Sequence, residues 1–103
     1  MAPRAGVDAR AVAERVIACP SVARLSGGPF GEVATYLPGL RVPGVRLVAG
    51  VLEVHVVSRW DVPVADLAAE VRAAAGPAAP GHEVIVFVED VELPAGDQEG
   101  RRS

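Results

Sequence analysis

Cys19 is the only cysteine of this chain, and its thiolate would be the strongest nucleophile available. A thiol enzyme needs a base beside the nucleophile, and His55 and His82 are the two histidines that could supply one. It also needs a group that orients the base and a site that stabilises an oxyanion, and no spacing in the sequence marks either. We therefore interpret Cys19 as a small core residue of a helix and predict no catalytic residue.

His55 lies two positions after Glu53, and His82 lies directly before Glu83. A histidine and a carboxylate are both zinc ligands, but a structural zinc site takes four ligands and a catalytic one takes three from the protein. We interpret His55 as a solvated surface residue of a strand and His82 as a loop residue. The sequence predicts no metal and no cofactor.

Three carboxylates crowd near the end of the last apolar run, at Glu89, Asp90 and Glu92. Oxygen ligands of this kind attract calcium or magnesium, although a built site needs six or more oxygens in a fixed geometry. A solvated acidic rim is the simpler interpretation.

Gly28-Pro29-Phe30-Gly31 matches the Gly-x-x-Gly pattern with which KH-type modules clamp an RNA backbone. Such a clamp needs basic support, but the chain has no lysine and Glu32 follows the pattern directly. The arginines closest to a cluster, Arg41, Arg46 and Arg59, are scattered among acids. A plain turn is favoured, and an RNA-binding module remains the alternative hypothesis.

The composition indicates one small domain in a reducing compartment. At 103 residues the chain can bury one core, and its formal net charge of -3 has the wrong sign for general attraction to phosphate. The N-terminus lacks the apolar segment of a signal peptide, and no apolar run is long enough to span a bilayer. We predict a cytoplasmic protein without direct membrane insertion and without a nucleic-acid partner.

The first part of the chain predicts a helix, a loop and a short strand. Asp8 can cap a helix that ends before Pro20. Its apolar positions recur at helical spacing: Val12, Ala13, Val16 and Ile17. The glycine-rich residues 26–31 predict a loop, and residues 33–37 predict a short strand that prolines and glycines then interrupt.

A hairpin is predicted next, over residues 45–60, with Ala49 and Gly50 in its turn. The longer second arm alternates in character, as a strand with one buried face does. The positions expected to face the core are Leu52, Val54 and Val56, and those expected to face outward are Glu53, His55 and Val57.

The last part of the chain predicts a helix and a closing strand. Pro63 suits the first turn of a helix, and Gly76 with Pro77 ends it. The stripe between them comprises Leu67, Ala68, Val71 and Ala75. Residues 84–88 form an apolar strand with Ile85 and Phe87 on one side, and a right-handed crossover would set it parallel to the long hairpin arm.

These elements predict an α+β fold, a two-layer sandwich in the order α-β-β-β-α-β. A small mixed sheet of three to four strands carries two helices on one face. The domain is expected over residues 8–93, with a flexible N-terminal tail at 1–7 and a disordered C-terminal tail at 94–103.

If both helices cover one face of the sheet, apolar side chains on the other face meet water. The predicted protein-interaction patch comprises Val57, Trp60, Ile85 and Phe87. Trp60 can instead seal the edge of the core, since it lies between strand and helix.

Four segments, CPSVARLSGG, VATYLPGLRVPGVRL, RWDVPVADLAAEVRAA and VFVEDV, resemble successive blocks of the alkaline shock protein family of bacterial envelope-stress proteins. The resemblance covers residues 11–91 and is strongest in the aromatic-x-Val-Pro helix start at 60–63, in the leucine and valine stripe that follows it, and in Val-Glu-Asp-Val at 88–91. Many relatives carry longer flanking segments and a glycine where this chain has Asp61.

The resemblance implies a non-enzymatic protein of the envelope stress response, without catalytic residues or a cofactor. Some members of that family are held at the inner face of the membrane by a separate membrane-spanning partner. We therefore expect a protein that works through protein–protein contacts at the cytoplasmic side of the membrane. Its expected partner is a membrane-spanning anchor or a related family member, and a homo-oligomer is the other assembly that the patch allows.

Overall fold

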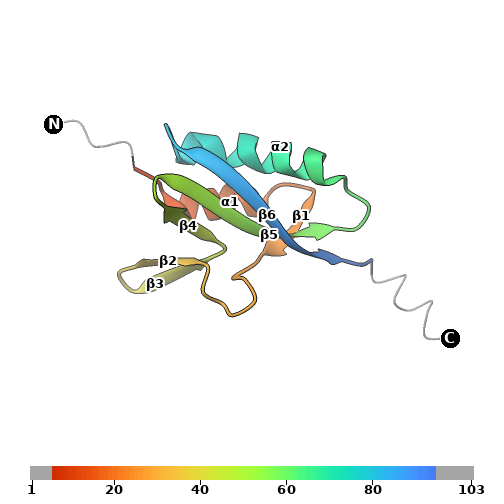
Figure 1. Cartoon of the computed structure of the whole chain (residues 1–103), viewed down its shortest axis with the longest axis horizontal. Helices are drawn as coiled ribbons and strands as arrows, with labels where there is room; N and C mark the ends of the chain where they lie inside the picture. Colours follow the sequence, from red (N-terminus) through yellow and green to blue (C-terminus); the bar gives the residue numbers. More distant parts are fainter. Residues whose placement is uncertain (1–5, 95–103) are drawn as a thin grey trace.

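The computed structural model of this chain describes residues 6–94 (Figure 1). Two α-helices, six strands and a short 3₁₀ helix follow one another. Their bounds are α1 Ala9–Ile17, β1 Val22–Leu25, β2 Ala34–Leu37, β3 Leu40–Pro43, β4 Val45–Val48, β5 Val51–Arg59, α2 Val64–Ala75, η1 Gly76–Ala78 and β6 Glu83–Glu92.

Strand β5 is the centre of a four-stranded mixed sheet. Strand β6 runs parallel to β5 along its whole length, as predicted. On the other edge of β5, two strands pair with it antiparallel, one after the other along its length. Strand β4 pairs with the first half of β5 and β1 with the second half.

Both helices pack on the same face of this sheet, which confirms the predicted two-layer α+β fold (Figure 1). The β5 side chains that face the helices are fully buried, as their alternation predicted: Leu52, Val54 and Val56. The helices contribute residues at helical spacing, chiefly Val12, Val16, Leu67 and Val71. Ile17, expected in the same stripe, is instead 56% exposed at the end of α1.

The N-terminal cap of α1 is Asp8, whose carboxylate accepts a hydrogen bond from the amide of Ala11 at 3.1 Å, as predicted. Helix α2 begins one residue later than expected, because Pro63 is its extended N-cap. Helix α2 ends at Ala75 with Gly76 as its C-cap, as predicted, and residues 76–78 then form the 3₁₀ turn η1.

Two strands were not predicted, so five strands rather than three separate the helices. Strand β1 is too short for its alternation to be read from sequence. Strand β3 pairs with β2 in a separate two-stranded hairpin below the main sheet (Figure 1). Gly39 closes that hairpin with a φ of 71°, so Pro38 and Gly39 turn the chain where an interruption was expected.

The β4–β5 hairpin is confirmed. Val48 pairs with Val51, and both turn residues, Ala49 at φ 51° and Gly50 at φ 83°, lie in the left-handed region. Two positive φ values are typical of a type I′ turn, whose twist matches that of the strands.

The predicted tails at 1–7 and 94–103 lie mostly outside the described residues. Val7, in the predicted N-terminal tail, packs against the core, and the amide of the next residue, Asp8, donates to the carbonyl of Ala78 at 3.0 Å. Ordered contacts therefore begin by residue 7.

Candidate functional site

The face of the sheet opposite the helices is the candidate site. Side chains alternate along strands, so the residues that flank the core-facing valines of β5 and β6 point to this face. We call this the outer face and define it by Glu53, His55 and Val57 of β5 and Ile85, Phe87 and Glu89 of β6.

His55 is buried on the outer face, with 6% of its surface exposed, so the prediction of a solvated histidine was wrong. Its ring stacks on the ring of Phe87, its register partner on β6, with centroids 4.4 Å apart and planes 8° apart. The burial comes from neighbouring side chains on the sheet, which alternation along a single strand cannot reveal.

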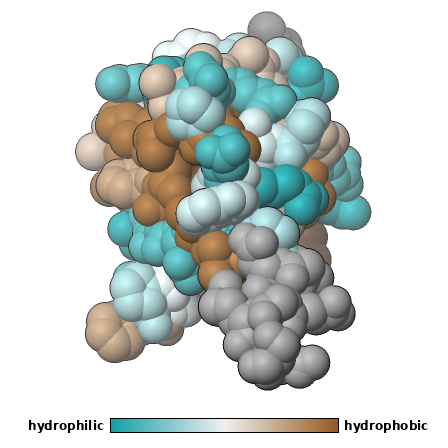
Figure 2. All heavy atoms as spheres, turned by 90° about the vertical axis from the view of Figure 1, so that its right-hand side faces the viewer, coloured by the Kyte–Doolittle hydropathy of each residue, from teal (hydrophilic) through white to brown (hydrophobic). Residues whose placement is uncertain are grey.

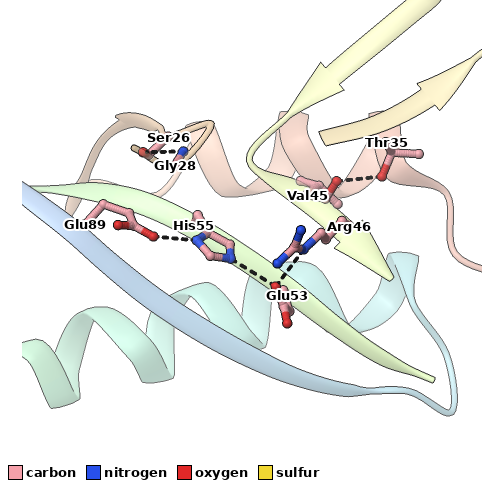
Figure 3. Close-up of polar contacts among 8 residues, drawn as sticks. All are labelled: Ser26, Gly28, Thr35, Val45, Arg46, Glu53, His55 and Glu89. Atoms are coloured by element: carbon pink, nitrogen blue, oxygen red, sulfur yellow. Dashed lines mark hydrogen bonds and ion pairs between the residues drawn. The ribbon is translucent and has the colours of Figure 1, made fainter. Parts of the chain in front are cut away.

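A chain of polar contacts joins His55 to three charged residues (Figure 3). Its Nδ1 lies 2.6 Å from Glu89 Oε2, and its Nε2 lies 3.1 Å from Glu53 Oε1. Arg46 Nε donates to the same Glu53 oxygen at 2.9 Å. Ionised carboxylates only accept, so both contacts are satisfied when both ring nitrogens donate.

The Glu53 carboxyl has a pKa below its ordinary value of 4.5. Burial raises its pKa, but the hydrogen bonds from His55 and Arg46 outweigh burial and leave the pKa lowered. The carboxylate is therefore held ionised as a structural partner.

A β-bulge places Glu89 within this network. Val56 pairs with Val88 and Val57 with Asp90, so Glu89 is an extra residue on β6. Beside the bulge is a hollow of about 430 Å³, which is lined by Glu89 and Asp90, by Val57 and by residues 24–29. Val57 is only 4% exposed, so its assignment to an exposed patch was wrong. Residues 24–29, from the end of β1 and the loop after it, lie next to Val57.

The other members of the predicted patch are accessible. Ile85 and Phe87 are 38% and 39% exposed on the outer face. Trp60 is 52% exposed and lines a second hollow of about 310 Å³ with Glu92 and Leu93, so it does not seal the core. Viewed from the end where the chain leaves β6, hydrophobic side chains gather on the left and towards the centre of the surface, among hydrophilic ones (Figure 2).

Cys19 belongs to the helix-side core, as interpreted from sequence, but it lies two residues beyond the end of α1 and not on the helix. Its thiol faces the carbonyl oxygens of Arg15 at 3.6 Å and Glu70 at 3.8 Å. Burial, assisted by the Glu70 carboxylate, raises the pKa of the thiol, which disfavours the reactive thiolate. His55 lies on the opposite face of the sheet, so the structure does not bring these two residues together.

The Gly28–Gly31 segment forms a turn with φ values of 86° and 73° at its two glycines. Its amides already have partners within the chain. The Gly28 amide donates to Ser26 Oγ, the Phe30 amide to Glu32 Oε1, and the Gly31 amide to the Gly28 carbonyl, each at 3.2 Å. The Glu32 carboxylate thus already accepts the hydrogen bond of the Phe30 amide, which a phosphate clamp would need for the phosphate.

The three arginines considered for RNA binding are engaged separately. Arg41 donates to the Gly31 carbonyl at 2.7 Å, Arg46 pairs with Glu53, and Arg59 donates to the Pro20 carbonyl at 3.0 Å. They belong to three different strands.

The acids at the end of β6 are also divided among partners. Glu89 contacts His55, Glu92 pairs with Arg24 at 3.1 Å, and Asp90 accepts from the amide of Val91 at 2.8 Å. Across residues 6–94, no three histidine, cysteine or acidic side chains are grouped so that they could hold a metal ion. No helix in that range has the length and hydropathy of a membrane span.

Comparisons of the chain with protein-family models, with curated proteins and with solved structures found no match.

Proposed function

We propose that this chain is a non-catalytic protein of the bacterial envelope stress response, which acts by binding another protein at the cytoplasmic side of the membrane. One observation carries the proposal: Ile85 and Phe87 of β6 are half-exposed on the outer face, and the ring of Phe87 is held by stacking on the buried ring of His55. Exposed apolar side chains rimmed by charged ones are typical of protein-binding surfaces.

The outer face is organised before any partner binds. Phe87 is stacked on a buried ring, and that ring is held between two carboxylates. A side chain that is already ordered loses little conformational entropy on association, so its apolar area contributes more fully to affinity. This is the physical basis for assigning binding, rather than a reaction, to this face.

The resemblance to the alkaline shock protein family is the basis for the proposed role in the envelope stress response. One of its strongest motifs, at residues 60–63, lies at the junction of β5 and α2. Asp61, where relatives carry glycine, has a φ of 67°, a conformation that glycine adopts most easily. The proposed location is peripheral, through a membrane-spanning partner.

RNA binding has less support. The amides of the Gly28–Gly31 turn are paired within the chain, and the arginines are engaged on separate strands. Capture of RNA or ribosomal components would nevertheless restore that hypothesis.

The test is to tag the protein in its native cells, crosslink mildly, separate membrane from cytosol and identify co-purifying proteins by mass spectrometry. Two matched variants sharpen it: Ile85→Arg on the outer face and Ile17→Arg on α1, where the isoleucine is also exposed. Arginine suits both places, because Ile85 is the register partner of Glu53 and Ile17 ends a helix.

We expect the protein to sediment with membranes and to crosslink to a membrane-spanning protein. Ile85→Arg should lose that partner while Ile17→Arg keeps it, with circular dichroism showing both variants folded. A protein that stays in the cytosol, or a partner retained by Ile85→Arg, would overturn the proposal.

A further inference from the structure

Strand β6 presents a free backbone edge. Among the described residues it pairs only with β5, so its other edge has no strand partner. The opposite edge of the sheet is not free in the same way, because the β2–β3 hairpin lies against it near β4. There the Thr35 hydroxyl donates to the Val45 carbonyl, and the Gly44 amide donates to the Val33 carbonyl at 2.8 Å.

The free edge is also strongly β-prone. Residues 84–88 are uncharged valine, isoleucine and phenylalanine, and none of their side chains is fully buried. A long edge of this kind is a template for an added strand, and proteins usually shield such edges by charge or by bulges. Here the bulge at Glu89 and the acids stand at the ends, and the centre is left open.

Charge decides what can occupy this edge. Strand β6 carries acids at both ends and no basic residue. If a second copy paired antiparallel through the whole of residues 84–88, Glu83 of one copy would face Glu89 or Asp90 of the other. Like charges directly opposite one another destabilise a strand pair.

We propose that the β6 edge binds an extended segment of a partner protein by strand addition, and that this segment has an apolar, β-prone centre with lysine or arginine at each end. Main-chain hydrogen bonds to β6 would provide affinity, and the apolar positions beside Ile85 and Phe87 would provide selectivity. Glu83 and Asp90 would attract the basic ends, roughly 20 Å apart along the strand. The inference deepens the proposed function by stating the chemistry of the partner.

The test begins with a displayed library of random 12-residue peptides, selected on the full-length protein. We expect enriched sequences with alternating apolar residues between basic ends. A synthetic peptide of the enriched sequence should shift the NMR signals of the β6 backbone amides and slow their hydrogen exchange. The same peptide with a central proline, which cannot complete the strand pairing, should no longer bind.

A double variant, Glu83→Gln with Asp90→Asn, measured at a concentration at which light scattering shows it to be monomeric, should weaken peptide binding by roughly fivefold and reduce its salt dependence. The matched control removes two acids from the helix side, Glu14→Gln with Asp66→Asn, and should leave affinity unchanged. Enrichment of acidic or proline-rich peptides, shifts confined to other surfaces, or no enrichment would overturn the inference.

This experiment separates the two proposals. If a membrane partner is captured through Ile85 but no peptide maps to β6, strand addition is wrong and the proposed function stands. If basic peptides bind β6 while cells show no membrane-associated partner, the edge assignment stands and the envelope role is wrong.

Discussion

His55 shows how a polar residue is accommodated on a face without helices. Its ring is covered by Phe87 and contacts a carboxylate through each nitrogen. A buried polar group is tolerated when its hydrogen bonds are made, and here Glu53 and Glu89 make them. The network therefore holds Phe87 in place on the outer face.

The lowered pKa of Glu53 predicts a pH-dependent contribution to stability. A carboxyl with a lowered folded-state pKa stabilises the fold above its ordinary pKa and loses that contribution as pH falls through the folded value. Glu53→Gln should therefore lower the free energy of unfolding at pH 7 by about 1 to 2 kcal/mol. The difference from wild type should shrink below about pH 4.

Urea denaturation at pH 7 and pH 3 measures both values. Glu14→Gln, on the exposed side of α1, serves as the control and should change neither. An equal loss at the two pH values would show that packing, and not charge, accounts for the effect.

Gly44 is the second residue-scale prediction. Its φ is 85°, and a Cβ there would lie 2.9 Å from Leu25 Cβ and 3.1 Å from the His55 carbonyl oxygen. Gly44→Ala should destabilise the fold by about 3 kcal/mol or more, because steric overlap adds to backbone strain. Gly39→Ala, with a φ of 71° and nothing within 4 Å, should cost only the strain, about 1 kcal/mol. Equal losses in thermal unfolding would contradict this.

At the scale of elements, two-residue turns decide which strands pair. The β4–β5 and β2–β3 hairpins both turn on a glycine with positive φ, at Gly50 and Gly39. The first was predictable because a long alternating strand follows it. The second was not, since β2 and β3 are short and prolines stand beside the turn.

The β4–β5 turn carries a correctable strain. Ala49 has a φ of 51°, which asparagine tolerates better than alanine. Ala49→Asn should raise the free energy of unfolding by about 0.5 kcal/mol, since it creates the Asn-Gly pair preferred in type I′ turns. Ala49→Val should lower it. Chemical denaturation of the two variants gives the answer, and a gain for valine would show that the turn is of another type.

For the whole molecule, the unequal covering of the sheet determines its interactions. The helices cover one face, the β2–β3 hairpin lies against the side of β4, and the outer face with the β6 edge stays accessible. The accessible side combines apolar side chains with acids at the strand ends. It is therefore suited to a partner with basic groups and poorly suited to a second copy.

The oligomeric state of the isolated protein tests whether the acidic strand ends prevent pairing with a second copy. The wild-type chain should be a monomer at micromolar concentration and low salt, because its acidic strand ends repel one another. Glu83→Gln with Asp90→Asn should promote dimers through the exposed edge. Size-exclusion chromatography with light scattering measures this. A wild-type dimer that dissociates on substitution of β6 residues would reverse the conclusion.

The sequence by itself determined the fold class, the two helices, the β4–β5 hairpin and the parallel closing strand, because these depend on local periodicity, capping and turn chemistry. The side chains of β5 that enter the core, Leu52, Val54 and Val56, followed from alternation. The Arg46–Glu53 pair was also within reach, since these residues are opposite one another in a two-residue hairpin.

Only the tertiary structure decided the burial of His55 and Val57, the position of Glu89 and the openness of the β6 edge. The burial of His55 and the position of Glu89 depend on the register between β5 and β6, strands separated by a whole helix in the chain. The burial of Val57 depends on the strand and loop of residues 24–29, and the openness of the β6 edge depends on which strands join the sheet. A bulge shifts that register by one residue, and no local pattern reports it. The sheet therefore brought together a charge network, a stacked aromatic ring and a free edge from positions whose sequence neighbours gave no sign of it.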